Sequence, residues 1–308
     1  MRVVIAGGTG SVGRAIAKHL ANQGHEIVLL TRRFRAELGI DQIHWDGRTV
    51  DQAWARELAG SMLINLAGEL VDRVPTKRNI DLLERSRVEP TLALVEASKV
   101  HGAPSLWLQM STLAIYGDGK EVVLDDDAPA ADGPRQMAGV AKAWEAAVRD
   151  ASAGRLVILR TGIVLQKNTP ALNRLVTITR AFLGGTVGSG KQWVSWIHIA
   201  DFLRVVDFII ANHGISGSVN VTSPNPIQNR DMMRSLRRVL GRPWSPPTPR
   251  FAIALGSWIL FRTDPQLALT GRRSVPSKLL AAGFQFEHTE FEEAVTNLLA
   301  LRATLSHS

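Results

Sequence analysis

The residues with the clearest chemical use are three glycines, Gly7, Gly10 and Gly13, in the stretch "GGTGSVG". They stand between a short apolar run at 2–6 and a segment at 12–24 with apolar residues at helical spacing. In such a turn one glycine allows a tight bend, one lets the backbone approach a diphosphate, and one lets helix and strand pack closely. The diphosphate then meets free N–H groups at the helix N-terminus. The predicted dinucleotide contacts are Gly7, Thr9, Gly10, Ser11, Val12 and Gly13.

The end of the second apolar run, 26–30, indicates which dinucleotide is bound. An acidic residue at this place would bind the ribose hydroxyls of NAD, whereas arginine suits the 2′-phosphate of NADP. The chain continues as "TRRFR", with no acidic residue before Glu37, and guanidinium groups bind phosphate through paired N–H bonds. We therefore expect Thr31, Arg32 and Arg33 to select NADP, with NAD the weaker ligand. The alternative is that these arginines coat a surface turn.

Two further strand ends complete the predicted cofactor site. Asp46, directly after a short strand at 43–45, is expected to bond the adenine amino group or, alternatively, to cap the next turn. The stretch "NLAG" ends the fourth strand with small residues where a cofactor must pass close to the backbone. Asn65 is expected to serve backbone geometry there. The predicted cofactor contacts in this stretch are Leu66, Ala67 and Gly68.

The elements that must position these residues alternate along the chain. Short apolar runs predict strands, and helical spacing fills most gaps between them, notably at 80–100 and 136–151. The predicted strands are 2–6, 26–30, 43–45, 61–68, 105–111, 155–165 and 218–223. This alternation predicts an α/β fold, a Rossmann-like doubly wound parallel sheet with a smaller C-terminal substrate lobe. The predicted boundaries are 1–165 and 195–223 for the Rossmann domain, and 166–194 and 224–308 for the lobe.

Four motifs in order, "GGTGSVG", "NLAG", "STLAIYG" and "WIHIAD", resemble the short-chain dehydrogenase/reductase superfamily, in particular its extended, epimerase-like branch. Longer stretches, among them "LGGTVGSGKQWVSWIHIAD" and "VPSKLLAAGFQF", are similar to NAD-dependent epimerase/dehydratase-like proteins with a C-terminal domain of unknown function. The resemblance covers essentially the whole chain. It implies a Rossmann core, a nicotinamide cofactor and a small C-terminal substrate lobe, in an atypical member of the superfamily.

The chain departs from the family pattern in the segment "GPRQMAGVAKAWEAAV", 133–148. The resemblance implies a Tyr-x-x-x-Lys pair there, in which the lysine lowers the pKa of the tyrosine so that the phenol can exchange a proton. Aligned on Glu145, the two positions hold Met137 and Ala141, and neither side chain can transfer a proton. Lys142 is a poor substitute, because it lies about 140° around the helix from Met137, whereas Ala141 lies about 40° away.

Three residues are candidates for the chemistry that the missing pair would perform. The resemblance implies that Thr112 bonds a substrate carbonyl. Lys142 and Tyr116 are also candidates, with a solvent-facing lysine and a structural tyrosine as the alternatives. Aromatic and amide side chains that follow a glycine-rich loop are expected to line a substrate pocket or else to serve plain packing. These predicted substrate contacts are Gln192, Trp193 and Trp196.

Several other polar features are expected to have structural or solvated roles. His198 is interpreted as a packing residue and Asp201 as a helix cap. The charged stretch at 72–79 is interpreted as a solvated loop, with contact to an anionic substrate as the alternative. The acidic run at 125–127 is expected to be solvated.

Composition narrows the function classes. With no cysteine and no other metal motif, no metal is predicted. The net charge is +8, but the lysines and arginines are dispersed, which favours phosphorylated small molecules over nucleic acid. The apolar stretch at 250–262 is too short to span a bilayer and is expected to pack in the core or meet a partner. No secretion signal begins the chain, so we expect a cytoplasmic protein without a membrane span; a homo-oligomer is left open.

Two hypotheses for function follow from these observations. The first is an NADP(H)-dependent oxidoreductase or epimerase-like enzyme that acts on a small carbonyl or sugar-like substrate without the usual Tyr-Lys pair. The second is a catalytically silent binding protein that senses NADP(H) or a ligand. The intact glycine turn favours the first hypothesis, and the replaced pair at Met137 and Ala141 favours the second.

Overall fold

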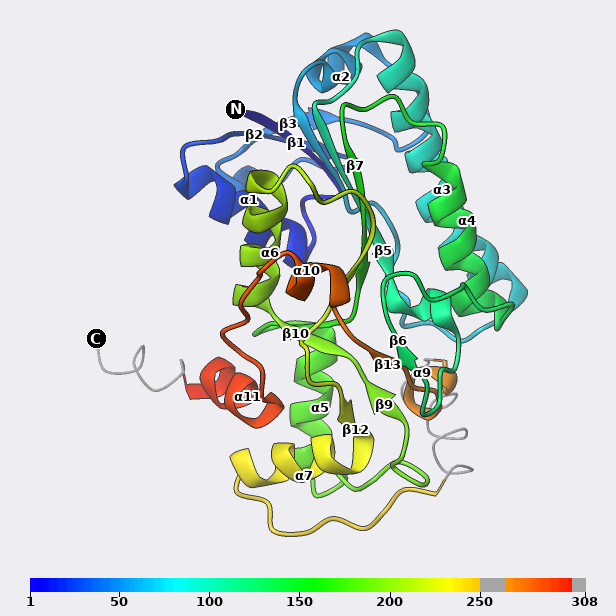
Figure 1. Cartoon of the computed structure of the whole chain (residues 1–308), viewed down its shortest axis with the longest axis vertical. Helices are drawn as coiled ribbons and strands as arrows, with labels where there is room; N and C mark the ends of the chain where they lie inside the picture. The colour runs from blue at the N-terminus through cyan, green and yellow to red at the C-terminus, as the bar shows by residue number, and fades with distance from the viewer. Residues whose placement is uncertain (250–263, 301–308) are drawn as a thin grey trace.

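A seven-stranded parallel sheet forms the centre of the computed structural model, which describes residues 1–249 and 264–300 (Figure 1). The strand order is β11-β7-β5-β4-β1-β2-β3, so the winding direction reverses between β1 and β4. The strands are β1 (Arg2–Ala6), β2 (Glu26–Thr31), β3 (Asp41–His44), β4 (Met62–Asn65), β5 (Leu106–Thr112), β7 (Leu156–Thr161) and β11 (Gly217–Val221). The prediction of a Rossmann-like doubly wound sheet is confirmed.

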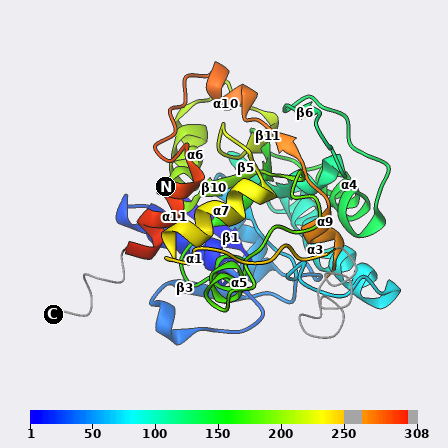
Figure 2. The same ribbon diagram turned by 90° about the horizontal axis from the view of Figure 1, so that it is seen from below.

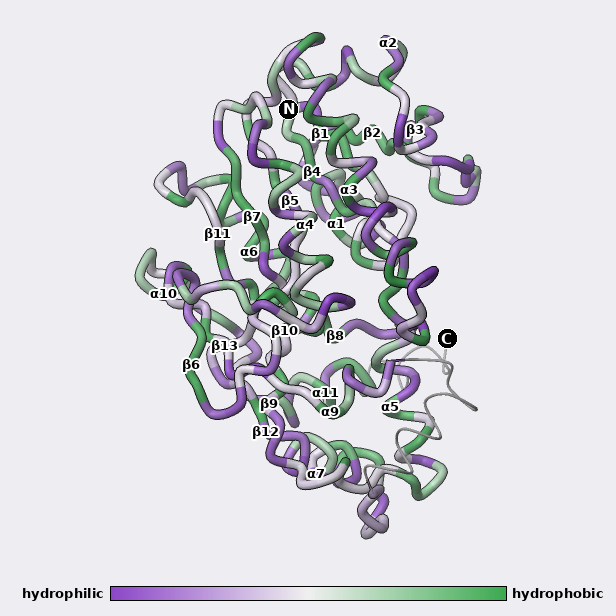
Figure 3. The backbone as a smooth tube through the Cα atoms, turned by 90° about the vertical axis from the view of Figure 1, so that its right-hand side faces the viewer, coloured by the Kyte–Doolittle hydropathy of each residue, from purple (hydrophilic) through white to green (hydrophobic). Residues whose placement is uncertain are grey.

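The central strands are apolar on both faces because helices cover both faces of the sheet. Residues 3–6 of β1 are 0% exposed, and Figure 3 shows the central strands mostly in green. One face is covered by α1 (Ser11–Asn22) and α6 (Ile199–Ala211), and the other by α2 (Gln52–Ala55), α3 (Lys77–Val100) and α4 (Val140–Ala147). The pattern of continuous apolar runs therefore follows from burial on two sides.

Strand register brings the predicted cofactor residues to one edge. Ala6 pairs with Leu30 of β2 and with Asn65 of β4, so the segments after these three strands begin side by side. The carboxyl ends of parallel strands form the ligand crevice of such sheets, at the point where the strand order reverses. The reversal between β1 and β4 falls at the glycine turn.

A second group of elements lies beyond the carboxyl ends of the strands, in the lower part of Figure 1 and in front in Figure 2. Its helices share a separate apolar core, to which Trp196 also belongs. These helices are α5 (Pro170–Arg180), α7 (Asn229–Val239) and α11 (Phe291–Ala300). The accompanying short strands are β8 (Ile163–Leu165), β9 (Trp193–Val194), β10 (Trp196–His198) and β12 (Ile227–Gln228). β8 pairs with β10, and β9 with β12.

The remaining C-terminal elements return to the main sheet. They are α9 (Gln266–Leu269), β13 (Arg273–Ser274) and α10 (Ser277–Ala281), and β13 pairs with β6 (Val123–Leu124). Leu279 and Phe284 belong to the main core although they fall inside the predicted lobe at 224–308. The lobe as predicted from sequence therefore contains a segment that packs on the Rossmann core.

Two predicted elements differ in detail from those in the structure. The run at 155–165 is two strands, because β8 leaves the sheet after Gly162, where a Cβ would lie 2.7 Å from the carbonyl oxygen of Ser195. The helix predicted at 136–151 begins with a π-helical turn, η4 (Arg135–Gly139), before α4. The apolar stretch at 250–262 lies outside the described residues, apart from which no helix is long and apolar enough to cross a membrane.

Candidate functional site

The three glycines of the first turn differ in what a side chain at each position would meet. Gly7 has φ +76°, and a Cβ there would lie 2.9 Å from the backbone of Leu66 and Ala67. A Cβ on Gly13 would lie 2.6 Å from Cα of Gly8, so this glycine lets α1 pack on the turn. Gly10 differs from both, because the nearest atom to its Cβ would be 3.7 Å away. The protein itself therefore leaves open space at Gly10.

The N-terminus of α1 is suited to a negatively charged group. Gly10 is its N-cap with φ −71° and ψ 169°, no side chain caps it, and no acidic residue lies in its first turn. The first N–H groups of a helix lack intrahelical partners and carry a partial positive charge. Together with the space at Gly10, these features fit the diphosphate of a dinucleotide.

The turn after β2 presents two arginines. The Thr31 hydroxyl donates to the carbonyl of Arg33 at 2.8 Å and accepts from its N–H at 3.2 Å. The Arg32 side chain is 72% exposed and lies 3.5 Å from a carboxylate oxygen of Glu69. Thr31 thus shapes the turn, and the two guanidinium groups extend from it toward solvent.

Asp46 makes the contacts of a turn cap. Its carboxylate accepts hydrogen bonds from the N–H groups of Arg48 and Thr49, both at 2.8 Å, and from the Thr49 hydroxyl at 2.8 Å. These bonds, that of the Thr49 N–H above all, lower the pKa of Asp46. These contacts are those expected if Asp46 caps the turn. A hydrogen bond from an adenine amino group to Asp46 stays a prediction.

A buried polar network fixes the end of β4 beneath the cofactor edge. The Asn65 amide, 0% exposed, donates to Thr91 at 2.9 Å and to Gln109 at 3.0 Å, and its oxygen accepts from the Ala67 N–H at 3.1 Å. Trp144 donates to the same Thr91 hydroxyl at 3.2 Å. Asn65 therefore holds backbone geometry, so that Leu66, Ala67 and Gly68 follow the strand in one defined path.

Thr112 ends β5 with a hydroxyl whose proton is available. Its oxygen accepts from the N–H of Ala114 at 3.2 Å, and the hydroxyl donates to no acceptor among the described residues. It can therefore donate a hydrogen bond to a ligand carbonyl. Met137 and Ala141 are 5% and 1% exposed, so the positions of the expected Tyr-Lys pair are apolar and packed.

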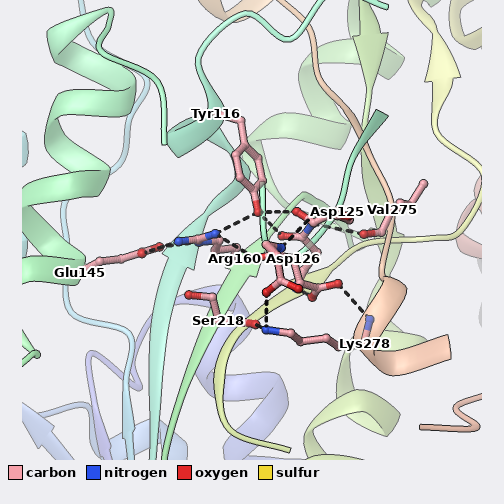
Figure 4. A network of polar contacts seen from close by, with 10 residues as sticks. Tyr116, Asp125, Asp126, Glu145, Arg160, Ser218, Val275 and Lys278 are labelled. Atoms are coloured by element: carbon pink, nitrogen blue, oxygen red, sulfur yellow. Dashed lines mark hydrogen bonds and ion pairs between the residues drawn. The ribbon is translucent and has the colours of Figure 1, made fainter. Parts of the chain in front are cut away.

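Tyr116 is held in a buried network (Figure 4). Its hydroxyl lies 2.8 Å from Oδ1 of Asn220 and accepts a hydrogen bond from Arg160 at 3.0 Å. Arg160 also binds both carboxylate oxygens of Glu145, at 3.0 and 2.9 Å. Burial raises the pKa of Tyr116. The phenol is engaged by the protein itself, as the structural alternative predicts.

The same network corrects the expectation for the acidic run at 125–127. Asp126 is 2% exposed, and its carboxylate accepts from the N–H groups of Asn220 at 2.5 Å and of Lys278 at 2.9 Å. Burial raises the pKa of Asp126. Only its neighbours in the run lie at the surface, so the expectation of a fully solvated run is wrong. Asp126 ties α10 to the end strand β11, a role that sequence gives no sign of.

The charged candidates lie at the surface. The Lys142 side chain is 40% exposed and its Nζ lies 3.6 Å from a carboxylate oxygen of Asp132. Arg73 pairs with Glu69 at 2.9 Å, and Lys77 and Arg78 are exposed at the start of α3. Lys142 is therefore directed to a flank of α4, as the helical geometry predicts.

The three predicted substrate residues have separate surroundings. The Gln192 amide donates to the carbonyls of Val187 and Ala268, at 3.1 and 2.9 Å. Trp193 is partly exposed, and its indole lies under the guanidinium of Arg273. Trp196 is 0% exposed in the core formed by α5, α7 and α11. The packing alternative describes Trp196 and Gln192, whose amide is bound by two backbone carbonyls, whereas Trp193 is partly exposed.

Two polar residues beside β10 have structural roles. His198 caps α6 by accepting from the N–H of Ala200 at 3.1 Å, and its ring stacks on His288 at 3.8 Å. Burial lowers the pKa of His198 to about 4. The buried Asp201 carboxylate accepts from the N–H groups of Glu287 and His288, at 2.9 and 2.8 Å. Asp201 thus joins α6 to the C-terminal segment, and the expectation that it caps the helix is wrong, because His198 is the N-cap.

Sequence reasoning missed Arg272. Its guanidinium reaches Met137, with Nη2 3.2 Å from the sulfur, across a separation of 135 residues. In the sequence it is one arginine of "TGRRS", which has the composition of a surface turn. Nothing in that pattern indicates burial or proximity to Met137.

In the described ranges, 1–249 and 264–300, no group of His, Cys, Asp or Glu is placed to hold a metal ion.

Comparisons with known proteins agree with this architecture. The family model for the NAD dependent epimerase/dehydratase family matches residues 3–222, and a domain of unknown function, DUF1731, matches residues 248–298. The chain is 30% identical to the epimerase family protein YfhF of Bacillus subtilis, over 99% of this chain and 100% of that protein.

Two solved structures are similar along nearly the whole chain. The crystal structure of human epimerase family protein SDR39U1 (isoform 2) with NADPH is 27% identical, with a TM-score of 0.85, and covers 97% of this chain and 99% of that one. A nucleoside-diphosphate sugar epimerase from Corynebacterium glutamicum is 28% identical, with a TM-score of 0.78, over 98% of this chain and 58% of that one. With its glycine turn, its switch point and these matches, the chain belongs to the NAD dependent epimerase/dehydratase family.

Proposed function

We propose that this protein binds NADP(H) and transfers hydride to or from a small carbonyl or sugar-like substrate, as an oxidoreductase or epimerase-like enzyme without a Tyr-Lys pair. The observation that carries the proposal is the open space at Gly10 in front of a helix N-terminus that has no acidic residue. The NADPH in the human relative's structure supports the choice of cofactor. The helix N-terminus at Gly10 would hold the diphosphate, on a turn whose shape depends on Gly7 and Gly13.

The arginines after β2 support NADP rather than NAD. Arg32 and Arg33 are exposed at the edge where an adenosine ribose follows the diphosphate in this fold. Guanidinium groups recognise a phosphate monoester through paired N–H bonds, which a ribose hydroxyl cannot reciprocate as strongly. The alternative, that they coat the turn, predicts equal binding of the two dinucleotides.

Three residues of the chain would surround the reacting groups. A bound NADPH would supply the hydride. Thr112 would donate a hydrogen bond to a substrate carbonyl oxygen, a role supported by a hydroxyl proton that has no acceptor in the described chain. Met137 and Ala141 exclude water from one wall but hold no proton. The proton must then come from solvent or from the substrate, which removes an acceleration of about 100- to 10,000-fold that a positioned acid provides.

The test compares cofactor binding and turnover in Gly10→Ala. The backbone angles of Gly10 suit alanine and its Cβ has room, so the variant keeps the fold while its methyl group occupies the diphosphate position. Gly214→Ala is the matched control, because Gly214 follows α6 at the opposite edge of the sheet and faces only the Asn212 side chain. NADPH binding and oxidation with carbonyl compounds should be lost in Gly10→Ala and kept in Gly214→Ala.

A second candidate function is a silent sensor of NADP(H). The packed apolar residues at Met137 and Ala141 favour it. The same experiment separates the two functions: NADPH binding that depends on Gly10 but is never accompanied by oxidation of NADPH, with any carbonyl compound, supports the sensor.

A further inference from the structure

The guanidinium of Arg272 forms no ion pair in the described part of the chain. Its Nη2 contacts two neutral groups, the Met137 sulfur at 3.2 Å and the Thr270 hydroxyl at 3.5 Å. Its Nε is buried without a hydrogen-bond partner among the described residues. Burial lowers the pKa of Arg272, but a guanidinium keeps its proton in proteins. The carboxylate of Asp118 acts on it only through space and accepts instead from the Gly271 N–H, so the guanidinium has no ion-paired or hydrogen-bonded carboxylate within the described ranges.

Two other arginines that point into the protein, Arg160 and Arg87, have their guanidinium groups bound by the protein itself. Arg160 binds both oxygens of Glu145 and the hydroxyl of Tyr116. Arg87 donates to the carbonyls of Leu83 and Glu69, at 2.9 and 2.8 Å. An unpaired buried charge costs free energy that a neutral side chain would avoid. The exception at Arg272 therefore calls for a partner from outside the chain.

The backbone around Arg272 holds the side chain in place. Its N–H donates to the carbonyl of Trp193 at 2.9 Å, and its own carbonyl accepts from the Ser195 hydroxyl at 2.8 Å. The preceding Gly271 lies so close that a Cβ would be 2.4 Å from the Trp193 N–H nitrogen, and its own N–H donates to Asp118 at 3.0 Å. These backbone contacts of Gly271 and Arg272 fix the position from which the guanidinium reaches Met137.

The location is the one where the family chemistry would occur. Met137 stands at the position where the resemblance implies the catalytic tyrosine. Trp193, whose indole is partly exposed, lies on the segment that holds the Arg272 backbone. A cation is therefore present beside the place of the missing phenol, and a guanidinium fork matches the two oxygens of a carboxylate or phosphate.

We propose that Arg272 binds an oxyanion of the substrate, a carboxylate or phosphate group carried on the carbonyl compound, beside Met137. This inference rests on the proposed function, because it names the substrate class of the same site. It makes Arg272 a substrate-binding residue, and it explains why the chain keeps a guanidinium to which its own fold, as far as it is described, offers no carboxylate within ion-pair distance.

The test measures binding of four small carbonyl compounds by titration calorimetry, with and without saturating NADPH. Pyruvate carries a carboxylate and dihydroxyacetone phosphate carries a phosphate, and their uncharged counterparts are methyl pyruvate and dihydroxyacetone. We expect one charged compound to bind at least 10-fold more tightly than its counterpart, and which one binds identifies the oxyanion. Arg272→Gln should weaken that binding about 10- to 100-fold, the range for hydrogen bonds to a charged group.

Two further variants serve as controls. Arg234→Gln removes the same charge from an exposed position on α7 and should leave binding unchanged. Arg272→Lys keeps the charge without the planar fork, so its binding should fall between those of the wild type and Arg272→Gln. Equal binding of charged and uncharged compounds, or the same affinity in Arg272→Gln as in the wild type, overturns the proposal.

A thermal unfolding measurement distinguishes ligand binding from a structural role. Because Arg272 is unpaired, Arg272→Gln should keep or raise the melting temperature; a marked decrease with unchanged affinity overturns the proposal. If Arg272→Gln fails to fold, Arg272→Lys decides by its affinity. NADPH binding is measured separately, so oxyanion binding through Arg272 in a protein that binds no NADPH would refute the proposed function alone.

Discussion

The glycine turn after β1 and the helix start at η4 lie on the same side of the molecule, beyond the carboxyl ends of the strands. The turn has two features that favour dinucleotide binding, the close approach at Gly7 and the open space at Gly10. The helix start lies beside the turn at 113–116 that follows β5, and it holds Met137 and Ala141 in a packed environment. The comparison shows that an open glycine turn stands in the same protein as a helix start with no side chain able to transfer a proton at Met137 or Ala141.

The largest expected effect is on the free energy of unfolding, and it tests whether the position of Ala141 has room for a lysine. Ala141 packs with Leu113, Ile115 and Tyr116, so Ala141→Lys would bury an unpaired ammonium and lower the free energy of unfolding by about 3 kcal/mol. Ala146→Lys, at an exposed position of the same helix, should change it by less than about 0.5 kcal/mol. Chemical denaturation measures both; equal stabilities would mean that a polar space for lysine persists.

The next prediction compares two glycines of the same turn, Gly13, which serves packing, and Gly10, which would serve ligand binding. Gly13→Ala places a methyl group against Gly8 and should cost about 2 kcal/mol in the free energy of unfolding. Gly10→Ala should cost less than about 0.5 kcal/mol, because its Cβ meets no close atom. Only Gly10→Ala should weaken NADPH binding without loss of stability. If the two variants exchange these properties, the assignment of roles is wrong.

A smaller effect tests cofactor choice. The double variant Arg32→Ala/Arg33→Ala should weaken NADPH binding about 10- to 30-fold and leave NADH binding unchanged, because the lost bonds reach the 2′-phosphate alone. Arg35→Ala, nearby and 56% exposed, is the control and should bind both dinucleotides as the wild type does. A parallel loss of NADPH and NADH affinity would contradict selection by these arginines.

The smallest effect concerns the lysine that remains. Lys142 pairs loosely with the exposed Asp132 at 3.6 Å, and such surface pairs contribute at most about 1 kcal/mol. Lys142→Ala should therefore leave NADPH oxidation unchanged and shift the free energy of unfolding by less than about 0.5 kcal/mol. A loss of turnover above about 100-fold would instead give Lys142 a catalytic role.

The features that could be predicted from the sequence are those set by neighbouring residues in the chain. The sheet and the glycine turn are local features, because apolar runs and glycine spacing report directly on strands and on a backbone turn. The asymmetry between Lys142 and Ala141 also followed from helical geometry. Asn65 was assigned to backbone geometry because its stretch ends a strand with small residues, and its buried contacts agree.

Features made by distant segments could not be predicted. Asp126 is buried because α10 and β11 surround it, and the run "DDD" gives no sign of either. Arg272 meets Met137 only in the fold, and the sequence around it resembles a surface turn. Trp196 follows a glycine-rich loop like a pocket residue, yet three helices cover it. Side-chain surroundings of this kind depend on tertiary packing, on which periodicity carries no information.

The central claim is that this chain transfers hydride from NADPH although Met137 and Ala141 replace the usual pair. A single-turnover reaction with NADPH deuterated at C4 of the nicotinamide, analysed by mass spectrometry of the products, tests it most directly. We expect deuterium on the former carbonyl carbon of an anionic substrate, retained in Lys142→Ala and lost in Gly10→Ala. Stoichiometric NADPH binding with no deuterium in any product would contradict it.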